Sequence, residues 1–191
     1  MLYNIGFLIF SLFYLPALAF KGKMHGDFNE RFADYGAETL AKLTACGGAI
    51  WIQAVSVGEV GLCRGLIPLL KEKFPGRPVV LSTITRTGNE LAKKLFGASA
   101  TVIYFPLDLS WIVRKAVSAI RPGIYIMVET EIWPNVITEL NRRGIPSVLI
   151  NGRISDRSVG LYRLVRGFLK PVLSGVDLFC MRTDTDAQRI T

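Results

Sequence analysis

The sequence has very few of the side chains from which metal sites and nucleophilic triads are built. Its only histidine, His25, lies in a polar stretch, which excludes a core Ser-His-Asp triad and any site with several histidine ligands. The three cysteines include no CxxC pair, so neither a disulfide framework nor a structural zinc site is expected. This cysteine usage fits a reducing, cytoplasmic setting.

Two phosphate-binding signatures are also missing. Neither a GxGxxG run nor a GxxxxGK[ST] run is present, so the sequence indicates neither a dinucleotide fingerprint nor a P-loop. The net charge of +8 still favours partners that carry negative charge, such as phosphorylated ligands, an anionic membrane surface or nucleic acid. Nucleic acid ranks last, because the basic residues are not interleaved with aromatic ones on an identifiable surface.

Charged side chains are absent from residues 1–20, which are mostly apolar. A run of this length can span a bilayer as a helix. Lys21 and Lys23 follow the run instead of preceding it, which disfavours a secretory signal peptide and keeps the remainder on the cytoplasmic side. We expect residues 1–20 to form a membrane anchor or interfacial helix, with a cleaved signal or a buried core helix as alternatives. Residues 21–48 are expected to form a polar bridge.

From residue 49 onward, short apolar runs alternate with amphipathic stretches. The expected strands are residues 49–55, 79–83, 101–105, 124–128, 147–150 and 178–181. The expected helices are residues 60–73, 89–96, 110–120, 135–143 and 158–173. This alternation predicts an α/β fold, a Rossmann-like doubly wound parallel sheet over residues 49–191.

The last residues of the sequence have the pattern of a further helix. Residues 182–189 follow the final expected strand, and Asp184 or Thr185 could cap a helix there. The chain stops at Thr191, so we expect it to be cut from a longer enzyme.

Carboxylates stand where two of the expected strands end. Glu59 follows the first strand, after Ser56 and Gly58, and Glu129 and Glu131 follow the fourth. Ligands collect at the carboxyl ends of parallel strands, so these side chains suggest a shared pocket with acid–base chemistry. Glu59 could act as a general base if burial raises its pKa. Alternatively, it only stabilises a helix N-terminus through the helix dipole.

The loop after the fourth strand also carries an aromatic and an amide side chain. Trp133 offers a flat apolar surface, and Asn135 can cap the next helix. The alternative is a capping loop with a core tryptophan. We favour a functional loop, because charge and aromatic surface cluster at a strand end.

Two further tracts are candidates for anion binding. The first follows the second expected strand and consists of Thr85, Arg86, Thr87 and Gly88. Its hydroxyls, guanidinium and glycine could bind an anion at a helix N-terminus, although a plain turn explains them equally well. Arg153 and Arg157 follow the fifth strand and could bind phosphate, including the head group of an anionic lipid. A solvated helix face explains part of this basic charge.

Together these tracts resemble the Kdo transferases, the 3-deoxy-D-manno-octulosonic acid transferases of Gram-negative lipopolysaccharide assembly. The matching runs are AVSVGE at 54–59, TITRTG at 83–88, YFPLD at 104–108, ETEIWPN at 129–135 and NGRISDRS at 151–158. Gln53 stands where the family often has histidine, and Gly152 where it usually has alanine.

The resemblance implies the N-terminal half of a GT-B glycosyltransferase, which would bind a lipid A precursor at the cytoplasmic face of the inner membrane. A C-terminal half would bind most of the donor, CMP-Kdo. Glu59 would be the general base for transfer with inversion, and Glu129 and Glu131 would form the second acidic motif. The family implies no metal and no cofactor. A non-catalytic domain that binds an anionic lipid or nucleotide is the alternative.

Overall fold

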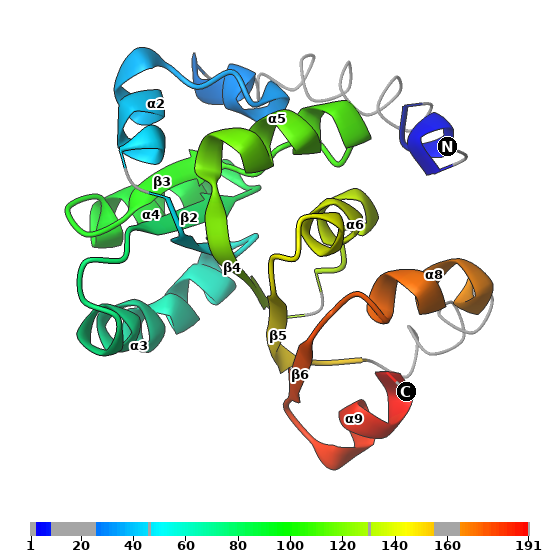
Figure 1. The fold of residues 1–191 in the computed structure, drawn as a ribbon. Coiled ribbons are helices and arrows are strands. Elements are labelled where there is room, and N and C mark those ends of the chain that lie inside the picture. Colours follow the sequence, from blue (N-terminus) through cyan, green and yellow to red (C-terminus); the bar gives the residue numbers. More distant parts are fainter. Residues whose placement is uncertain (1–2, 9–25, 46, 130, 155–164, 191) are drawn as a thin grey trace.

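The computed structural model describes residues 3–8, 26–45, 47–129, 131–154 and 165–190. In chain order its strands are β1 (Ala49–Gln53), β2 (Val79–Thr83), β3 (Thr101–Tyr104), β4 (Pro122–Val128), β5 (Ser147–Gly152) and β6 (Leu178–Met181). They form one parallel sheet in the order β3-β2-β1-β4-β5-β6 (Figure 1). The α/β fold with a Rossmann-like parallel sheet is therefore confirmed.

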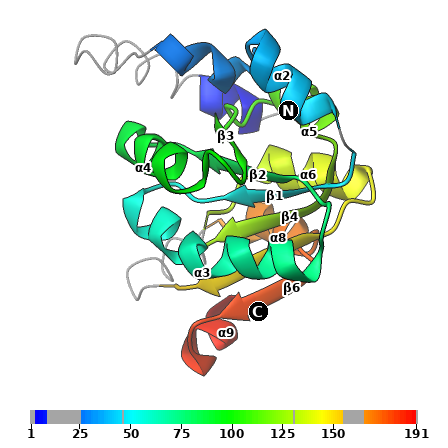
Figure 2. The ribbon, with the colours of Figure 1, turned by 90° about the vertical axis from the view of Figure 1, so that its left-hand side faces the viewer.

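The connecting helices divide between the two faces of the sheet. One face is covered by α3 (Val57–Lys73) and α4 (Arg86–Phe96) (Figures 1 and 2). The other is covered by α5 (Ser110–Ile120), α6 (Pro134–Arg142) and α8 (Arg166–Leu173). The chain builds β1 to β3 outward, then returns through α5 to place β4 beside β1. The direction of winding therefore reverses between β1 and β4, the position where such sheets bind ligands.

Each face of the sheet has its own hydrophobic core. On the α5 and α6 face, the fully buried Trp51 ring lies 4.7 Å from the Tyr125 ring and 5.9 Å from the Phe105 ring, centroid to centroid. On the other face, Ile52 packs with Cys63 and other apolar side chains of α3 and α4. All residues of β1 and β2 are buried, as expected for central strands of a parallel sheet.

The expected boundaries hold for three elements and shift for others. The bounds of β2, β6 and α5 match the sequence prediction. Both α3 and α4 begin three residues before the predicted starts, because their N-cap positions are Ser56 and Thr85. Of the predicted helix 158–173, the structure describes α8, and residues 158–164 lie outside the described part.

Two helices lie within the stretch that the sequence analysis marked as a polar bridge. They are the 3-10 helix η1 (Gly26–Phe32) and α2 (Ala37–Thr44). The Glu30 carboxylate of η1 accepts a hydrogen bond of 2.8 Å from the backbone N–H of Tyr104 in the edge strand β3. Residues of η1 and α2 thus pack onto the sheet domain and satisfy part of its open edge.

The last helix, α9 (Asp184–Ile190), confirms that residues 184–190 are helical. Its cap is Thr183, whose hydroxyl oxygen accepts a 3.1 Å hydrogen bond from the Asp186 backbone N–H and donates to the Asp186 carboxylate. The prediction of Asp184 or Thr185 as the cap was therefore wrong by one or two positions.

The described part of the N-terminal segment, residues 3–8, is helical and lies beside α5 (Figure 1). Its apolar side chains Ile5 and Leu8 are 47% and 44% exposed. Most of the expected anchor lies outside the described residues. Among the residues described, none of the helices has both the length and the apolar character needed to cross a membrane.

Candidate active site at the β1–β4 junction

Glu59 lies in the first turn of α3, directly after β1. One carboxylate oxygen accepts a 2.6 Å hydrogen bond from the Val55 backbone N–H, and the other accepts one of 3.1 Å from the Ser56 hydroxyl. Ser56 is the N-cap residue and Glu59 the third helical residue, the spacing of a capping box. Gly58, between them, is exposed. Glu59 is only 7% exposed, so its carboxylate is held in one orientation.

The second acidic tract begins with an unusual backbone conformation. Glu129 has a φ of 61°, in the left-handed region that residues with a side chain seldom adopt. Its backbone N–H donates a 2.9 Å hydrogen bond to the Ile150 carbonyl of β5, which ties the start of the loop to the sheet. Such strained residues cluster at functional sites. The strain therefore supports a functional role for this turn.

The acidic side chains from the two strand ends influence one another. Burial, together with the charges of Glu59 and Glu129, raises the pKa of Glu131 to about 7. Burial also raises the pKa of Glu59, opposed by its hydrogen bonds from Val55 and Ser56 and reinforced by Glu129. The charges of the three carboxyl groups that the sequence analysis selected therefore act on one another across the two strand ends.

This arrangement can hold and move a proton near neutral pH. The two hydrogen bonds to Glu59 favour its ionised form, which can accept a proton. Glu131, with a pKa of about 7, is close to half protonated at neutral pH. Carboxyl groups whose pKa values are raised toward neutral pH can serve as general acids or bases.

Helix α6, which follows the acidic loop, is capped by a residue that the sequence analysis did not select. Its N-cap position is Trp133, which makes no side-chain cap, and Pro134 is its first residue. The Asp108 carboxylate accepts hydrogen bonds from the backbone N–H groups of Asn135 (3.1 Å) and Val136 (3.0 Å). The prediction that Asn135 caps this helix was therefore wrong, because Asn135 is its second residue. The clue was the lone carboxylate of the YFPLD run at 104–108.

The tract after β2 has mainly structural partners. The Thr85 hydroxyl oxygen caps α4 by accepting a 3.1 Å hydrogen bond from the Gly88 backbone N–H. The Arg86 guanidinium pairs with Glu90 at 2.8 Å on the exposed helix surface. Thr87 is exposed and Gly88 is buried. Anion binding by these four residues stays a prediction.

Arg153 follows β5 at the same edge of the sheet and is exposed. It contributes to a lowered pKa of Asp186, for which the hydrogen bond from Thr183 is the main cause. Arg157 lies outside the described residues, so phosphate binding by this pair stays a prediction. Within the described ranges, no group of three or more His, Cys, Asp and Glu side chains is placed to hold a metal ion.

Gln53, the last residue of β1, is fully buried. Its side-chain oxygen accepts a hydrogen bond from the Ser82 hydroxyl, which in turn accepts one of 2.8 Å from the Trp51 indole N–H. The Gln53 amide nitrogen is buried without a hydrogen-bond partner among the described residues. A polar layer therefore lies between the aromatic core and the strand end that carries Glu59.

The sequence profile of one family, described as 3-deoxy-D-manno-octulosonic-acid transferase (kdotransferase), matches residues 26–191. The chain belongs to this family. The match includes β1 with Glu59 and β4 with Glu129 and Glu131, so the two tracts at the sheet reversal fall inside the family's own domain.

Individual Kdo transferases support the assignment. The chain is 35% identical over 140 residues to the 3-deoxy-D-manno-octulosonic acid transferase of Haemophilus influenzae, covering 73% of this chain and 33% of that one. It is 32% identical over 188 residues to the enzyme of the same name from Chlamydophila psittaci, covering 96% and 43%. A bifunctional glycosyltransferase/methyltransferase of Fusobacterium nucleatum is 36% identical over 146 residues, covering 74% and 22%. The chain therefore spans less than half the length of these relatives.

Proposed function

We propose that this chain forms the acceptor-binding half of a glycosyltransferase that moves Kdo from CMP-Kdo to a lipid A precursor. The observation that supports it best is the meeting of Glu59 with Glu129 and Glu131 where the sheet reverses, which makes the carboxyl groups interact. Family membership supplies the reaction class, because the related proteins are named Kdo transferases. A GT-B arrangement, with a second domain that binds most of the donor, is part of the proposal.

In the proposed reaction Glu59 is the general base. Its carboxylate takes the proton from a hydroxyl of the acceptor sugar while that oxygen forms a bond to the anomeric carbon of Kdo. The bond from this carbon to the CMP phosphate breaks, CMP leaves with the electron pair, and the configuration at carbon inverts. The contacts from Val55 and Ser56 fix the carboxylate before substrate arrives, which reduces the cost of orientation. The step uses no metal or cofactor.

The proposal places the protein at the cytoplasmic face of the inner membrane. The uncharged residues 1–20 would be the anchor, and the exposed apolar side chains of Ile5 and Leu8 are consistent with contact with lipid. Arg153 and Arg157 would contact phosphate groups of the acceptor. Nucleic acid is not among the proposed partners.

A second candidate function is a non-catalytic domain that binds an anionic lipid or nucleotide. The contacts of Glu59 favour it, because a glutamate in the first turn of a helix can be explained by helix stability alone. The two candidates differ in what the loss of this carboxylate should do. A catalytic Glu59 is essential for transfer, whereas a capping Glu59 affects only folding.

A mass-spectrometric transfer assay separates these candidates. The full-length gene product is mixed with CMP-Kdo and a tetraacylated lipid A precursor, and Glu59→Gln is compared with Glu72→Gln, an exposed position on the same helix. We expect the Kdo mass increment in the wild type and the control, and its loss in Glu59→Gln with acceptor binding retained. Transfer that survives in Glu59→Gln would move the base to another group, Glu131 first. No transfer by folded wild-type protein would favour the binding domain.

A further inference from the structure

Asp108 is a fully buried carboxylate that the proposed mechanism does not use. It follows β3, and its exposed fraction is 0%. One oxygen accepts hydrogen bonds from the Asn135 backbone N–H and, at 2.8 Å, from the Tyr3 hydroxyl, and the other accepts from the Val136 backbone N–H. A buried carboxylate is costly unless its oxygens are satisfied in this way. Asp108 therefore links three segments that are far apart in the sequence.

The loop with Glu129 and Glu131 is held at its two ends. At its start, the Glu129 backbone N–H is bonded to β5. At its end the chain enters α6, where Trp133 contributes no side-chain cap and Pro134 has no N–H. The first two available N–H groups of the helix both donate to Asp108. The end of the loop that enters α6 is thus fixed by a residue of the β3–α5 loop.

A second contact from the same β3–α5 region reinforces this attachment. The Phe105 ring lies 5.1 Å from the Trp133 ring, centroid to centroid. The pKa of the buried Tyr125 hydroxyl is raised, mainly by burial and then by the charges of Asp108 and Glu131. Both carboxyl groups therefore act on this tyrosine. Movement of Asp108 would therefore reach Glu131 through the backbone at the start of α6.

We infer that Asp108 is a positioning residue, whose cap on α6 holds the partly buried Glu131 where the charge of Glu59 acts on it. The catalytic consequence rests on the proposed function, whereas the structural consequence does not. Asp108 acts through the backbone of α6 and touches no reacting atom.

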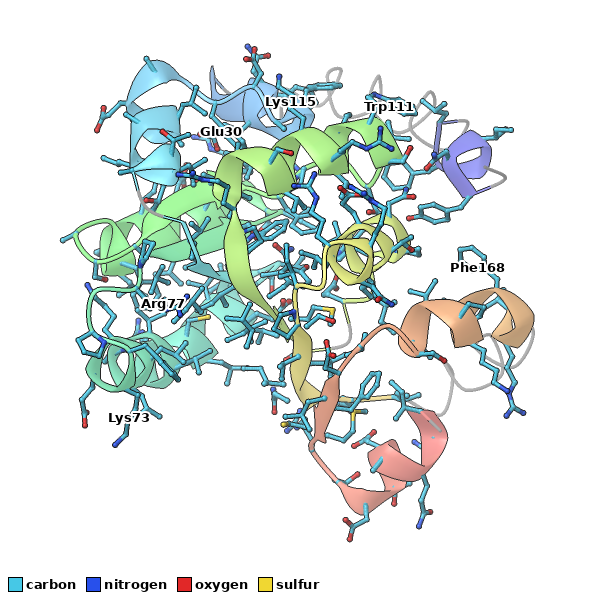
Figure 3. The ribbon with its side chains drawn as sticks, in the orientation of Figure 1. Glu30, Lys73, Arg77, Trp111, Lys115 and Phe168 are labelled. Carbon is cyan, nitrogen blue, oxygen red and sulfur yellow. The ribbon has the colours of Figure 1, made fainter. Side chains whose placement is uncertain are left out.

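The same cap connects the site to the N-terminal helical segment. Tyr3 donates to Asp108, and the Asn135 amide donates a 2.7 Å hydrogen bond to the side-chain oxygen of Asn4. The Tyr3 ring also stacks at 5.6 Å on Phe168, which projects from α8 toward this segment (Figure 3). Docking of residues 3–8 therefore supports the carboxylate that caps α6.

The test compares Asp108→Asn with Glu139→Gln in the full-length gene product. The asparagine keeps the shape of the side chain but places an N–H₂ group against one of the two helix N–H donors. Glu139 lies near the other end of α6 and pairs with Arg142 and Arg143, so its loss weakens the same helix away from the loop. The first readout is the pKa of Glu131, measured by carboxyl ¹³C NMR, with Glu131→Gln used to identify its signal. The second readout is kcat for transfer.

In Asp108→Asn we expect Glu131 to titrate closer to an ordinary glutamate. We also expect kcat to fall by about 10- to 100-fold, the scale of the loss when active-site geometry shifts by about 1 Å. Glu139→Gln should leave the titration of Glu131 unchanged. An unchanged titration in folded Asp108→Asn would overturn the inference, whatever the activity. If Asp108→Asn does not fold, Tyr3→Phe, which removes one donor to Asp108, should shift Glu131 in the same direction, and no shift there would also refute it. An inactive wild type would refute the proposed function alone, because the titration needs no substrate.

Discussion

Replacement of Gly88 by alanine tests how the Glu59 loop is supported. Gly88 is in the first turn of α4, where an added Cβ would lie 2.8 Å from the Thr85 hydroxyl oxygen. It would also lie 3.2 Å from the Val55 carbonyl oxygen and 3.3 Å from the Ser56 carbonyl carbon. These backbone atoms belong to the turn that holds the Glu59 carboxylate. Gly88→Ala should therefore push α4 away from this turn.

The magnitude follows from three opposing contributions. Alanine in place of glycine inside a helix stabilises the fold by about 0.5–1 kcal/mol. Displacement of the Thr85 hydroxyl would remove the cap of α4, at a cost of about 1 kcal/mol. Overpacking against the Val55–Ser56 backbone costs about 1–3 kcal/mol more. Gly88→Ala should therefore lower the free energy of unfolding by about 1–3.5 kcal/mol and, under the proposed function, reduce transfer by displacing Glu59.

The matched control is Gly65→Ala in α3. Gly65 is also inside a helix, but an added Cβ there meets no atom within 4 Å. This variant should gain about 0.5–1 kcal/mol. Urea unfolding at pH 7 compares the two midpoints at equal m-values. A Gly88→Ala protein as stable as Gly65→Ala would show that α4 is not packed against the Glu59 turn, and the reasoning would fail.

Three other substitutions probe the charges. Glu131 has a folded pKa of about 7, above its unfolded value, so it stabilises the fold most below pH 4.5 and loses this contribution as pH rises through 7. Glu131→Gln should remove about 3 kcal/mol of this pH dependence, seen in urea unfolding at pH 4.5 and 8. The pH dependence from Glu139 has the opposite sign, because the hydrogen bonds that its carboxylate accepts from Arg142 lower its pKa to about 2. Glu139→Gln should cost about 1–2 kcal/mol at pH 7 and progressively less as pH falls from 4.5 toward 2. Arg153→Ala should weaken acceptor binding by about 1–3 kcal/mol, measured by titration calorimetry, and unchanged affinity would rule out phosphate contact there.

The strands of the sheet could be predicted from the sequence because strands buried on both faces carry apolar side chains almost without interruption. Residues 79–83 show this pattern between clear breakers, and the structure gives β2 the same bounds. The starts of α3 and α4 were harder to predict. Ser56 and Thr85 look like loop residues, and the glycines after them conceal the first helical turn. In η1, Glu30 binds a β3 backbone N–H far along the chain, a contact that local periodicity does not reveal.

The candidate site was predictable where it depends on strand ends. Glu59 and Glu131 follow strands that the winding order of a doubly wound sheet makes neighbours. Asp108 was not selected, because its role depends on contacts with α6 and Tyr3, which are distant in sequence. The left-handed conformation of Glu129 was equally hidden, since nothing in its residue type favours a positive φ.

The pairing of β1 with β4 has a consequence for how the site arises during folding. Every other pair of neighbours in the sheet is consecutive in the chain, whereas β2 and β3 separate β1 from β4. Closing the longest loop costs the most entropy, so the β1–β4 pairing should follow the local pairings. Glu59 follows β1 and Glu131 follows β4, so their charges can interact only after these two strands have paired. A refolding experiment should therefore recover helical circular dichroism before Glu131 regains its raised pKa, so the electrostatic coupling between the two strand ends should form late in folding.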